Sequence, residues 1–347
     1  MSIFAHRYGP NIANWILTNS PFNTTLNLKG IAAGNACWGG DATNVQCNGP
    51  HEEQNDVELF YNKALISKKL YKAAHEACKW APTASSSSSW SGASGGESIE
   101  CAKTLAEVHE AVGPHNIYNL YDNCPASLLL SDQEAGLAPR ALKQLLRKRA
   151  LPGAQSGAPS ADEADGSAIP SPVESEDGSH LRAAVAKTGG YAWSCGGMQA
   201  TAKWITTPAV QAALHLKAGS GSRFRYDLSG PASITLWPFL ATHIRVLIYN
   251  GDADACVPYI GNAEWIEALE ERGVLKEKQA WRPWYVGTKG RLGGKPPAGY
   301  VTSYDVTGAP DFDFSFATIR LAGHMVPTFM PGASLAFFER FLARKPI

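Results

Sequence analysis

Two residues with the chemistry of an acid–base pair follow two apolar segments in the C-terminal third of the chain. Asp254 lies in the turn Gly-Asp-Ala-Asp after the stretch 244–249, and His324 lies in a glycine turn after the stretch 314–321. A histidine can take a proton from a nucleophile and return it to a leaving group, while an aspartate accepts its other N–H and fixes its tautomer. An Asp followed downstream by a His at such turns fits the chain order nucleophile–Asp–His.

Both residues also have an ordinary structural interpretation. An aspartate at the end of a strand is a common turn former, and a lone histidine is often an interior residue with satisfied hydrogen bonds. Asp252, in the same turn, competes with Asp254 for the acid role on pattern alone.

The elements that must position this pair predict an α/β fold. Each apolar strand is followed by a turn and then by a helix, at 262–273 with Gly273 closing it and at about 333–343. Strand–turn–helix repeated in this way indicates a parallel sheet, whose functional groups collect at the carboxyl ends of its strands. Upstream, the pattern predicts a helix at 11–18, a buried strand within 26–35, a helix over 52–79 and a helix at 206–216 that begins at Pro208.

Composition excludes several classes of protein. Lys+Arg and Asp+Glu both number 31, so the formal net charge is zero, which argues against a nucleic-acid binder. Ten Trp, twelve Tyr and twelve Phe favour a packed globular protein. We find no apolar run near the roughly 18 residues that a membrane span needs.

The cysteines favour disulfides over metal. They number seven and include no CxxC pair or zinc-type spacing, so we expect no metal; they are Cys37, Cys47, Cys78, Cys101, Cys124, Cys195 and Cys256. Scattered cysteines in a loop-rich chain indicate a disulfide framework and an oxidising compartment. The sequon Asn23-Thr24-Thr25, a candidate glycosylation site, points the same way. The start MSIFAHRYGP lacks the features of a secretory leader. A missing N-terminal segment would explain both this and the odd number of cysteines.

Several segments, in the right order, resemble the serine carboxypeptidase family. They are NLKGIAAGNACWGG, KALISKKLY, YNLYDNC, TTPAVQAALHL, IYNGDADACVPYIGNAEW and RLAGHMVPTFMPGASLAFFERFL. The resemblance covers most of the chain outside the low-complexity segments 83–97 and 151–180. It implies an α/β-hydrolase fold with a helical cap insertion: hydrolase core at 1–35, cap at 36–190 and the rest of the core at 191–347.

The resemblance assigns roles residue by residue. It makes Asp254 the triad acid, Asp252 structural and His324 the triad base. Met325 matches a position that lines the pocket for the substrate's C-terminal side chain, although a Met packed beneath the turn explains it equally well. Asn35, at the end of the strand, is interpreted as structural.

The resemblance also implies how the cysteines pair. Cys37–Cys47 fits a short disulfide, and Cys78 pairs with Cys101 or Cys124. Cys195 matches a cysteine whose partner lies far upstream in the family, and Cys256 is expected to stay outside the disulfides. The basic run 147–149 resembles a processed segment, but a basic helix end before a disordered insertion is the alternative.

The family's nucleophile elbow, Gly-Glu-Ser-Tyr, is not found in the 347 residues. It directly precedes a helix that matches RYGPNIANWIL, and alignment on Pro10 places Ile3 at the serine position, Ser2 at the glutamate and Phe4 at the tyrosine. An isoleucine offers no nucleophile, so we expect the chain as given to be inactive.

Three interpretations of function follow. The first is a serine carboxypeptidase that releases C-terminal residues from peptides and whose serine region is missing from this sequence. The second is a non-catalytic family member that acts as a binding module, and the third is a serine carboxypeptidase-like acyltransferase. The resemblance implies no cofactor, peptide substrates, a homodimer as a possible assembly, and a lysosomal, vacuolar or secreted setting for the full-length protein.

Overall fold

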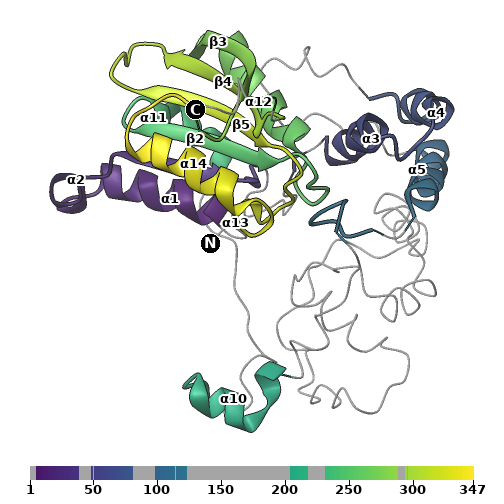
Figure 1. The fold of residues 1–347 in the computed structure, drawn as a ribbon, viewed down its shortest axis with the longest axis horizontal. Coiled ribbons are helices and arrows are strands. Elements are labelled where there is room, and N and C mark those ends of the chain that lie inside the picture. The colour runs from purple at the N-terminus through teal and green to yellow at the C-terminus, as the bar shows by residue number, and fades with distance from the viewer. Residues whose placement is uncertain are drawn as a thin grey trace, which may run out of the picture.

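The computed structural model describes residues 5–38, 48–49, 51–80, 98–113, 115–122, 204–217, 231–287, 294 and 296–347. Its centre is a five-stranded mixed sheet with the strand order β1-β2-β5-β4-β3 (Figure 1). The strands are β1 (Gly30–Gly34), β2 (Arg245–Gly251), β3 (Leu275–Trp284), β4 (Gly299–Val306) and β5 (Asp313–Ile319). Strands β1, β2 and β5 are parallel, whereas β4 pairs with β5 and with β3 in antiparallel fashion.

The sheet corrects one part of the sequence prediction. The two predicted apolar strands are β2 and β5, which are neighbours in the sheet. They are not consecutive strands along the chain, because β3 and β4 come between them in the sequence. Strand β3, LKEKQAWRPW, is an edge strand in which only the first and last residues are buried. Its polar sequence therefore carries no apolar alternation that would have predicted a strand.

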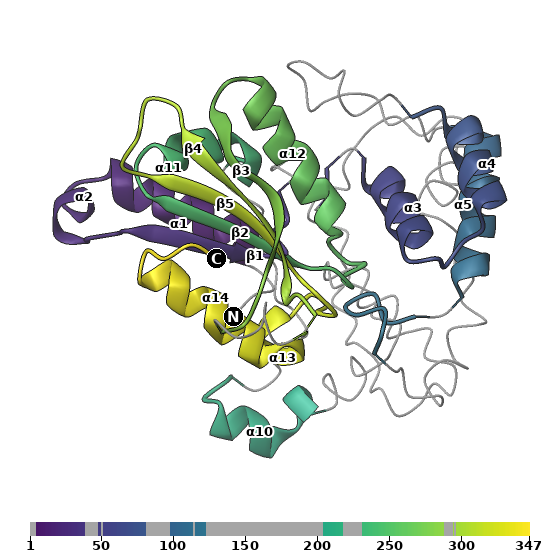
Figure 2. The same ribbon diagram turned by 45° about the horizontal axis from the view of Figure 1, so that its top comes forward.

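Helices cover both faces of the sheet, as the tilted view in Figure 2 shows. On one face, Val246 and Ile248 of β2 share a core with α1 (Ala5–Thr18), α11 (Trp237–Ala241) and α12 (Tyr259–Glu271). On the other, Leu247 packs with α13 (Val326–Phe329) and α14 (Pro331–Leu342). This alternation follows from the two-residue period of a strand that is buried on both faces.

The predicted helix 52–79 is two helices, α3 (Glu52–Asn62) and α4 (Lys68–Cys78). Ala64 has a left-handed φ of 57°, which ends the first helix. The side chain of Ser67 then caps the second by accepting from the amide of Leu70 at 3.2 Å. Helix α5 (Ile99–Val112) packs on α4, and these helices lie beside the sheet rather than over it (Figures 1 and 2).

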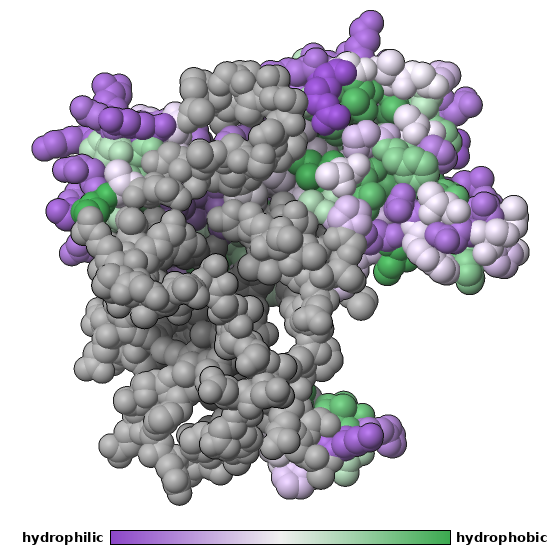
Figure 3. All heavy atoms as spheres, turned by 180° about the vertical axis from the view of Figure 1, so that it is seen from behind, coloured by the Kyte–Doolittle hydropathy of each residue, from purple (hydrophilic) through white to green (hydrophobic). Residues whose placement is uncertain are grey.

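The remaining short elements are α2 (Phe22–Thr25), α10 (Pro208–Ala213) and a 3₁₀ turn, η4 (Ser233–Thr235). Pro208 begins α10, as predicted. On the face seen in Figure 3, hydrophobic side chains reach the surface in several places among hydrophilic ones. None of the helices in the described part of the chain is long and apolar enough to cross a membrane.

Candidate active site

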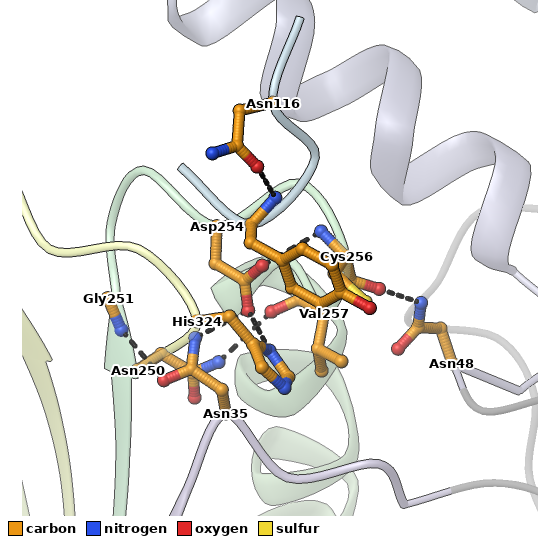
Figure 4. A network of polar contacts seen from close by, with 10 residues as sticks. Asn35, Asn48, Asn116, Asn250, Gly251, Asp254, Cys256, Val257 and His324 are labelled. Atoms are coloured by element: carbon orange, nitrogen blue, oxygen red, sulfur yellow. Dashed lines mark hydrogen bonds and ion pairs between the residues drawn. The ribbon is translucent and has the colours of Figure 1, made fainter. Parts of the chain in front are cut away.

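Asp254 and His324 lie together at the carboxyl ends of two neighbouring strands. Asp254 is in the turn that follows β2 and His324 is in the turn that follows β5. Because β2 and β5 pair in parallel, with Gly251 opposite Ile319, both turns leave the sheet at the same edge. Oδ2 of Asp254 lies 2.8 Å from Nδ1 of His324 (Figure 4). Asp254 is fully buried and His324 is 2% exposed, so this contact is shielded from water.

A glycine in the first turn, Gly251, allows the two turns to come so close. A Cβ atom on Gly251 would overlap the carbonyl oxygens of Ala322 and Gly323 in the opposite turn. The amide of Ala253 donates to the carbonyl of Ala322 at 2.8 Å, which links the two turns directly. A side chain at Gly251 would therefore separate the turns that hold Asp254 and His324.

Asp254 accepts three hydrogen bonds in all. Besides His324, the amide nitrogen Nδ2 of Asn35 donates to Oδ2 at 2.6 Å, and the backbone amide of Cys256 donates to Oδ1 at 2.8 Å. A buried carboxylate needs such donors because burial without partners is strongly unfavourable. The donors also fix the carboxylate plane, which in turn orients the imidazole.

The side chain of Asp252, the competing acid, does not contact His324 but makes two other contacts. Its Oδ1 accepts from the amide of Leu321 at 2.7 Å, and Oδ2 lies 3.6 Å from Nζ of Lys63. Burial raises the pKa of Asp252, and the positive charge of Lys63 opposes this rise. Asp252 thus ties the turn after β2 to the turn after β5 and to the region between α3 and α4, while Asp254 is the acid against the imidazole.

Asn35, interpreted from the sequence as structural, bonds directly to the candidate acid. It ends β1 with a left-handed φ of 48° and is fully buried. Its amide nitrogen donates to Asp254, and its side-chain oxygen accepts from the backbone amide of Gly251 at 3.1 Å. The available signal in the sequence was an Asn directly after a predicted buried strand, since Asn tolerates the left-handed conformation common at such turns.

The structure places the other predicted residues as follows. Met325 directly follows His324, is half-buried and precedes α13. Asn23 is exposed on α2. Residues Ser2, Ile3 and Phe4 lie outside the described residues.

For the cysteines, the structure resolves one open pairing. Cys78 is joined to Cys101, with the Cα atoms 4.5 Å apart, and Cys124 lies outside the described residues. Cys37 is disulfide-bonded, but its pairing with Cys47 stays a prediction because Cys47 is outside the described part. Cys256 carries a thiol. Among the described residues, no cluster of His, Cys, Asp and Glu could hold a metal ion.

The fold and the paired turns define a class, the α/β-hydrolase fold. A solved structure of Kex1(delta)p, a prohormone-processing carboxypeptidase from Saccharomyces cerevisiae, matches 98% of this chain and 60% of its own length with a TM-score of 0.50 and 18% identity. At that identity the match establishes the fold alone.

Sequence comparison then defines the family. A profile of the serine carboxypeptidase family matches residues 3–344. The chain is 28% identical over 372 residues to serine carboxypeptidase-like 21 of Arabidopsis thaliana, covering 99% of this chain and 64% of the relative. It is 25% identical over 335 residues to serine carboxypeptidase 1 of Hordeum vulgare, covering 92% and 57%. The chain belongs to the serine carboxypeptidase family, a family of hydrolases, and spans about three fifths of the length of these relatives.

Proposed function

We propose that Asp254 and His324 are the acid and the base of a Ser-Asp-His triad, and that the whole protein releases C-terminal residues from peptides. The observation that carries the proposal is the contact of 2.8 Å between Asp254 Oδ2 and His324 Nδ1, with both residues buried. Because Nδ1 bonds to the aspartate, Nε2 is the nitrogen that would take the proton of a serine hydroxyl. Membership of the serine carboxypeptidase family supports the reaction class.

The nucleophile has to come from a segment that precedes α1. The Gly-Glu-Ser-Tyr elbow is not found in the 347 residues, and in the family it directly precedes the helix that α1 matches. The sheet supports such an addition. Among the described strands β1 pairs only with β2, so its other edge is open for a further parallel strand. A strand added there and continued by α1 would reach β1 through an ordinary β–α–β connection.

Exposed apolar side chains on the two helices beside that edge support the same addition. Helix α1 packs on β1, and its Ile12 and Trp15 are 57% and 50% exposed. On the other face, Phe341 of α14 lies within 3.0 Å of a Cβ built on Gly30, and Leu342 beside it is 61% exposed. Further strands would cover these side chains, which is the usual reason for a cluster of exposed apolar residues.

The setting of the protein is part of the same proposal. The disulfide between Cys78 and Cys101 supports an oxidising compartment, and hence a lysosomal, vacuolar or secreted protein. Asn23 is exposed, as a glycan acceptor must be. Met325 as a substrate-pocket residue and the homodimer remain predictions.

The test uses two proteins, the 347-residue chain and the product of the complete locus. The chain alone should not hydrolyse blocked dipeptides at acidic pH or react with a fluorophosphonate probe, because it lacks the nucleophile. The complete product should do both, and Asp254→Asn or His324→Ala should lower its kcat by about 10⁴-fold. Labelling of the short chain at Ser2 would overturn the assignment of the missing serine.

Other outcomes identify the alternative functions. A complete locus without an in-frame elbow would indicate a non-catalytic binding module. Transfer of an acyl group to an alcohol in place of hydrolysis would indicate an acyltransferase.

A further inference from the structure

One irregular segment of the insertion, residues 116–122 after α5, contacts both turns of the candidate triad. Two backbone hydrogen bonds join this segment to the turn of Asp254. The amide of Ala255 donates to the carbonyl of Ile117 at 2.9 Å, and the amide of Leu120 donates to the carbonyl of Ala253 at 2.9 Å. The residues on either side of Asp254 are therefore both held by this segment.

The same segment holds the turn of His324. The amide of His324 donates to the carbonyl of Tyr118 at 2.7 Å. The ring centroids of Tyr118 and His324 are 5.3 Å apart. Gly323 has no room for a side chain, because a Cβ there would overlap the carbonyl of Tyr118 and the side chain of Asn119. The segment therefore packs on the backbone next to the candidate base as closely as atoms allow.

Two buried asparagines give the segment its shape. The side-chain oxygen of Asn116 accepts from the amide of Tyr118 at 2.9 Å, and that of Asn119 accepts from the amide of Tyr121 at 3.0 Å. Asn116 is 2% exposed and Asn119 is 5% exposed. Such side chain–backbone bonds two residues apart define Asx turns, which fix the direction of the carbonyls between them. Figure 4 shows Asn116 above the turn that carries Asp254 and Cys256.

We propose that residues 116–122 form a clamp that sets the spacing of Asp254 and His324, with Asn116 and Asn119 as positioning residues. The proposal rests on the triad role assigned to Asp254 and His324. The sheet alone joins the two turns through the backbone bonds of Asp252 to Ile319 and of Ala253 to Ala322. The clamp adds three backbone bonds, to Ala253, Ala255 and His324, so that one segment holds the turns on both sides of the Oδ2–Nδ1 contact.

The arrangement also makes the insertion part of the catalytic geometry. The clamp follows directly after α5, and α5 is joined to α4 by the disulfide between Cys78 and Cys101. Movement of these helices would therefore reach the carbonyls that bind Ala255 and His324. Catalytic side chains have to be held to within about 0.5 Å, so a displacement of this size matters for activity.

The experiment compares Asn116→Ala with Asn116→Ser in the 347-residue chain labelled with ¹⁵N. Serine keeps an acceptor for the amide of Tyr118, whereas alanine does not. We measure hydrogen exchange at the amides of His324 and Ala255, together with the Nδ1 proton resonance of His324, identified by its absence in His324→Gln.

We expect Asn116→Ala to speed exchange at both amides at least tenfold relative to the parent chain and to broaden or remove the Nδ1 proton resonance. Asn116→Ser should restore both. Glu270→Ala is the matched control, because it also removes a side-chain acceptor for a backbone amide, that of Glu277 at 3.2 Å, but lies on α12, away from α4 and α5. It should leave the exchange at His324 and Ala255 and the Nδ1 resonance as in the parent.

Equal effects of Asn116→Ala and Glu270→Ala would overturn the proposal, since the change would then reflect overall stability. Unchanged exchange at the amides of His324 and Ala255 in Asn116→Ala would overturn the proposal as well. If Asn116→Ala does not fold, Asn119→Ala, which removes the second Asx turn, carries the same expectations. None of these measurements requires a nucleophile, so the failure of the clamp and the failure of the peptidase proposal are distinguishable.

Discussion

Replacement of Asn35 tests how the buried aspartate is held. Asn35→Ala removes a donor to the Asp254 carboxylate, worth about 1.5–3 kcal/mol, and an acceptor for the amide of Gly251, worth about 0.5–1.5 kcal/mol. It also puts an ordinary residue at a φ of 48°, which costs about 1–2 kcal/mol for a residue without the polar side chain of Asn. The free energy of unfolding should therefore fall by about 3–6.5 kcal/mol.

Asn35→Gly separates the two contributions. Glycine loses the same hydrogen bonds but adopts the left-handed conformation without steric cost, so it should be about 1 kcal/mol more stable than the alanine variant. Urea unfolding followed by tryptophan fluorescence measures both. Asn23→Ala is the control, because Asn23 is exposed and its replacement should change stability by less than about 0.5 kcal/mol. A loss below about 1 kcal/mol for Asn35→Ala, or a glycine variant weaker than alanine, would refute this account of the site.

Three further predictions concern other parts of the fold. A hydrogen bond that His51 donates to the Glu264 carboxylate raises the pKa of His51 above its ordinary value of 6.5. This contact should therefore stabilise the chain below about pH 6.5 and lose its effect as pH rises through the raised pKa. Glu264→Gln should flatten this part of a curve of unfolding free energy against pH. Replacement of both Cys78 and Cys101 by alanine removes a disulfide that spans a sequence separation of 23 and leaves the disulfide of Cys37 in place; it should cost about 3 kcal/mol in urea unfolding, and equal stability of the variant and the parent chain would contradict this. Gly299→Ala would force a methyl group onto the carbonyl of Thr318, so unfolding free energy should fall by about 3 kcal/mol, whereas a neutral result would argue against the β4–β5 register.

The candidate pair was predictable because its elements are locally encoded. Strand β2 is a run of apolar residues buried on both faces, and an acidic turn directly after such a strand is visible without a structure. The turn with His324 after β5 is visible for the same reason. The local pattern alone could not choose the acid, because Asp252 and Asp254 are two residues apart in one turn; the family resemblance selected Asp254, and in the structure it is Asp254 that contacts His324.

The contributions of Asn35 and of the clamp at 116–122 depended on the tertiary structure. Asn35 lies 219 residues before Asp254 in the sequence, and their contact exists only because β1 pairs with β2. Similarly, residues 116–122 bind the turns of Asp254 and His324 through backbone carbonyls and amides, which every residue has, so the side chains do not reveal these contacts. The sequence did not predict the hairpin β3–β4, because its edge strand β3 is exposed along most of its length and has no apolar period.

The sequence by itself thus determined the family resemblance, the type of fold and two residues able to act as acid and base. These depend on local apolar patterns and on the order of motifs along the chain. The tertiary structure decided which residues hold Asp254 and which cysteine bonds to Cys78. The physical reason is that a hydrogen bond or a disulfide between residues far apart in the sequence requires their backbones to meet, and the packing of the sheet and the helices sets where they meet.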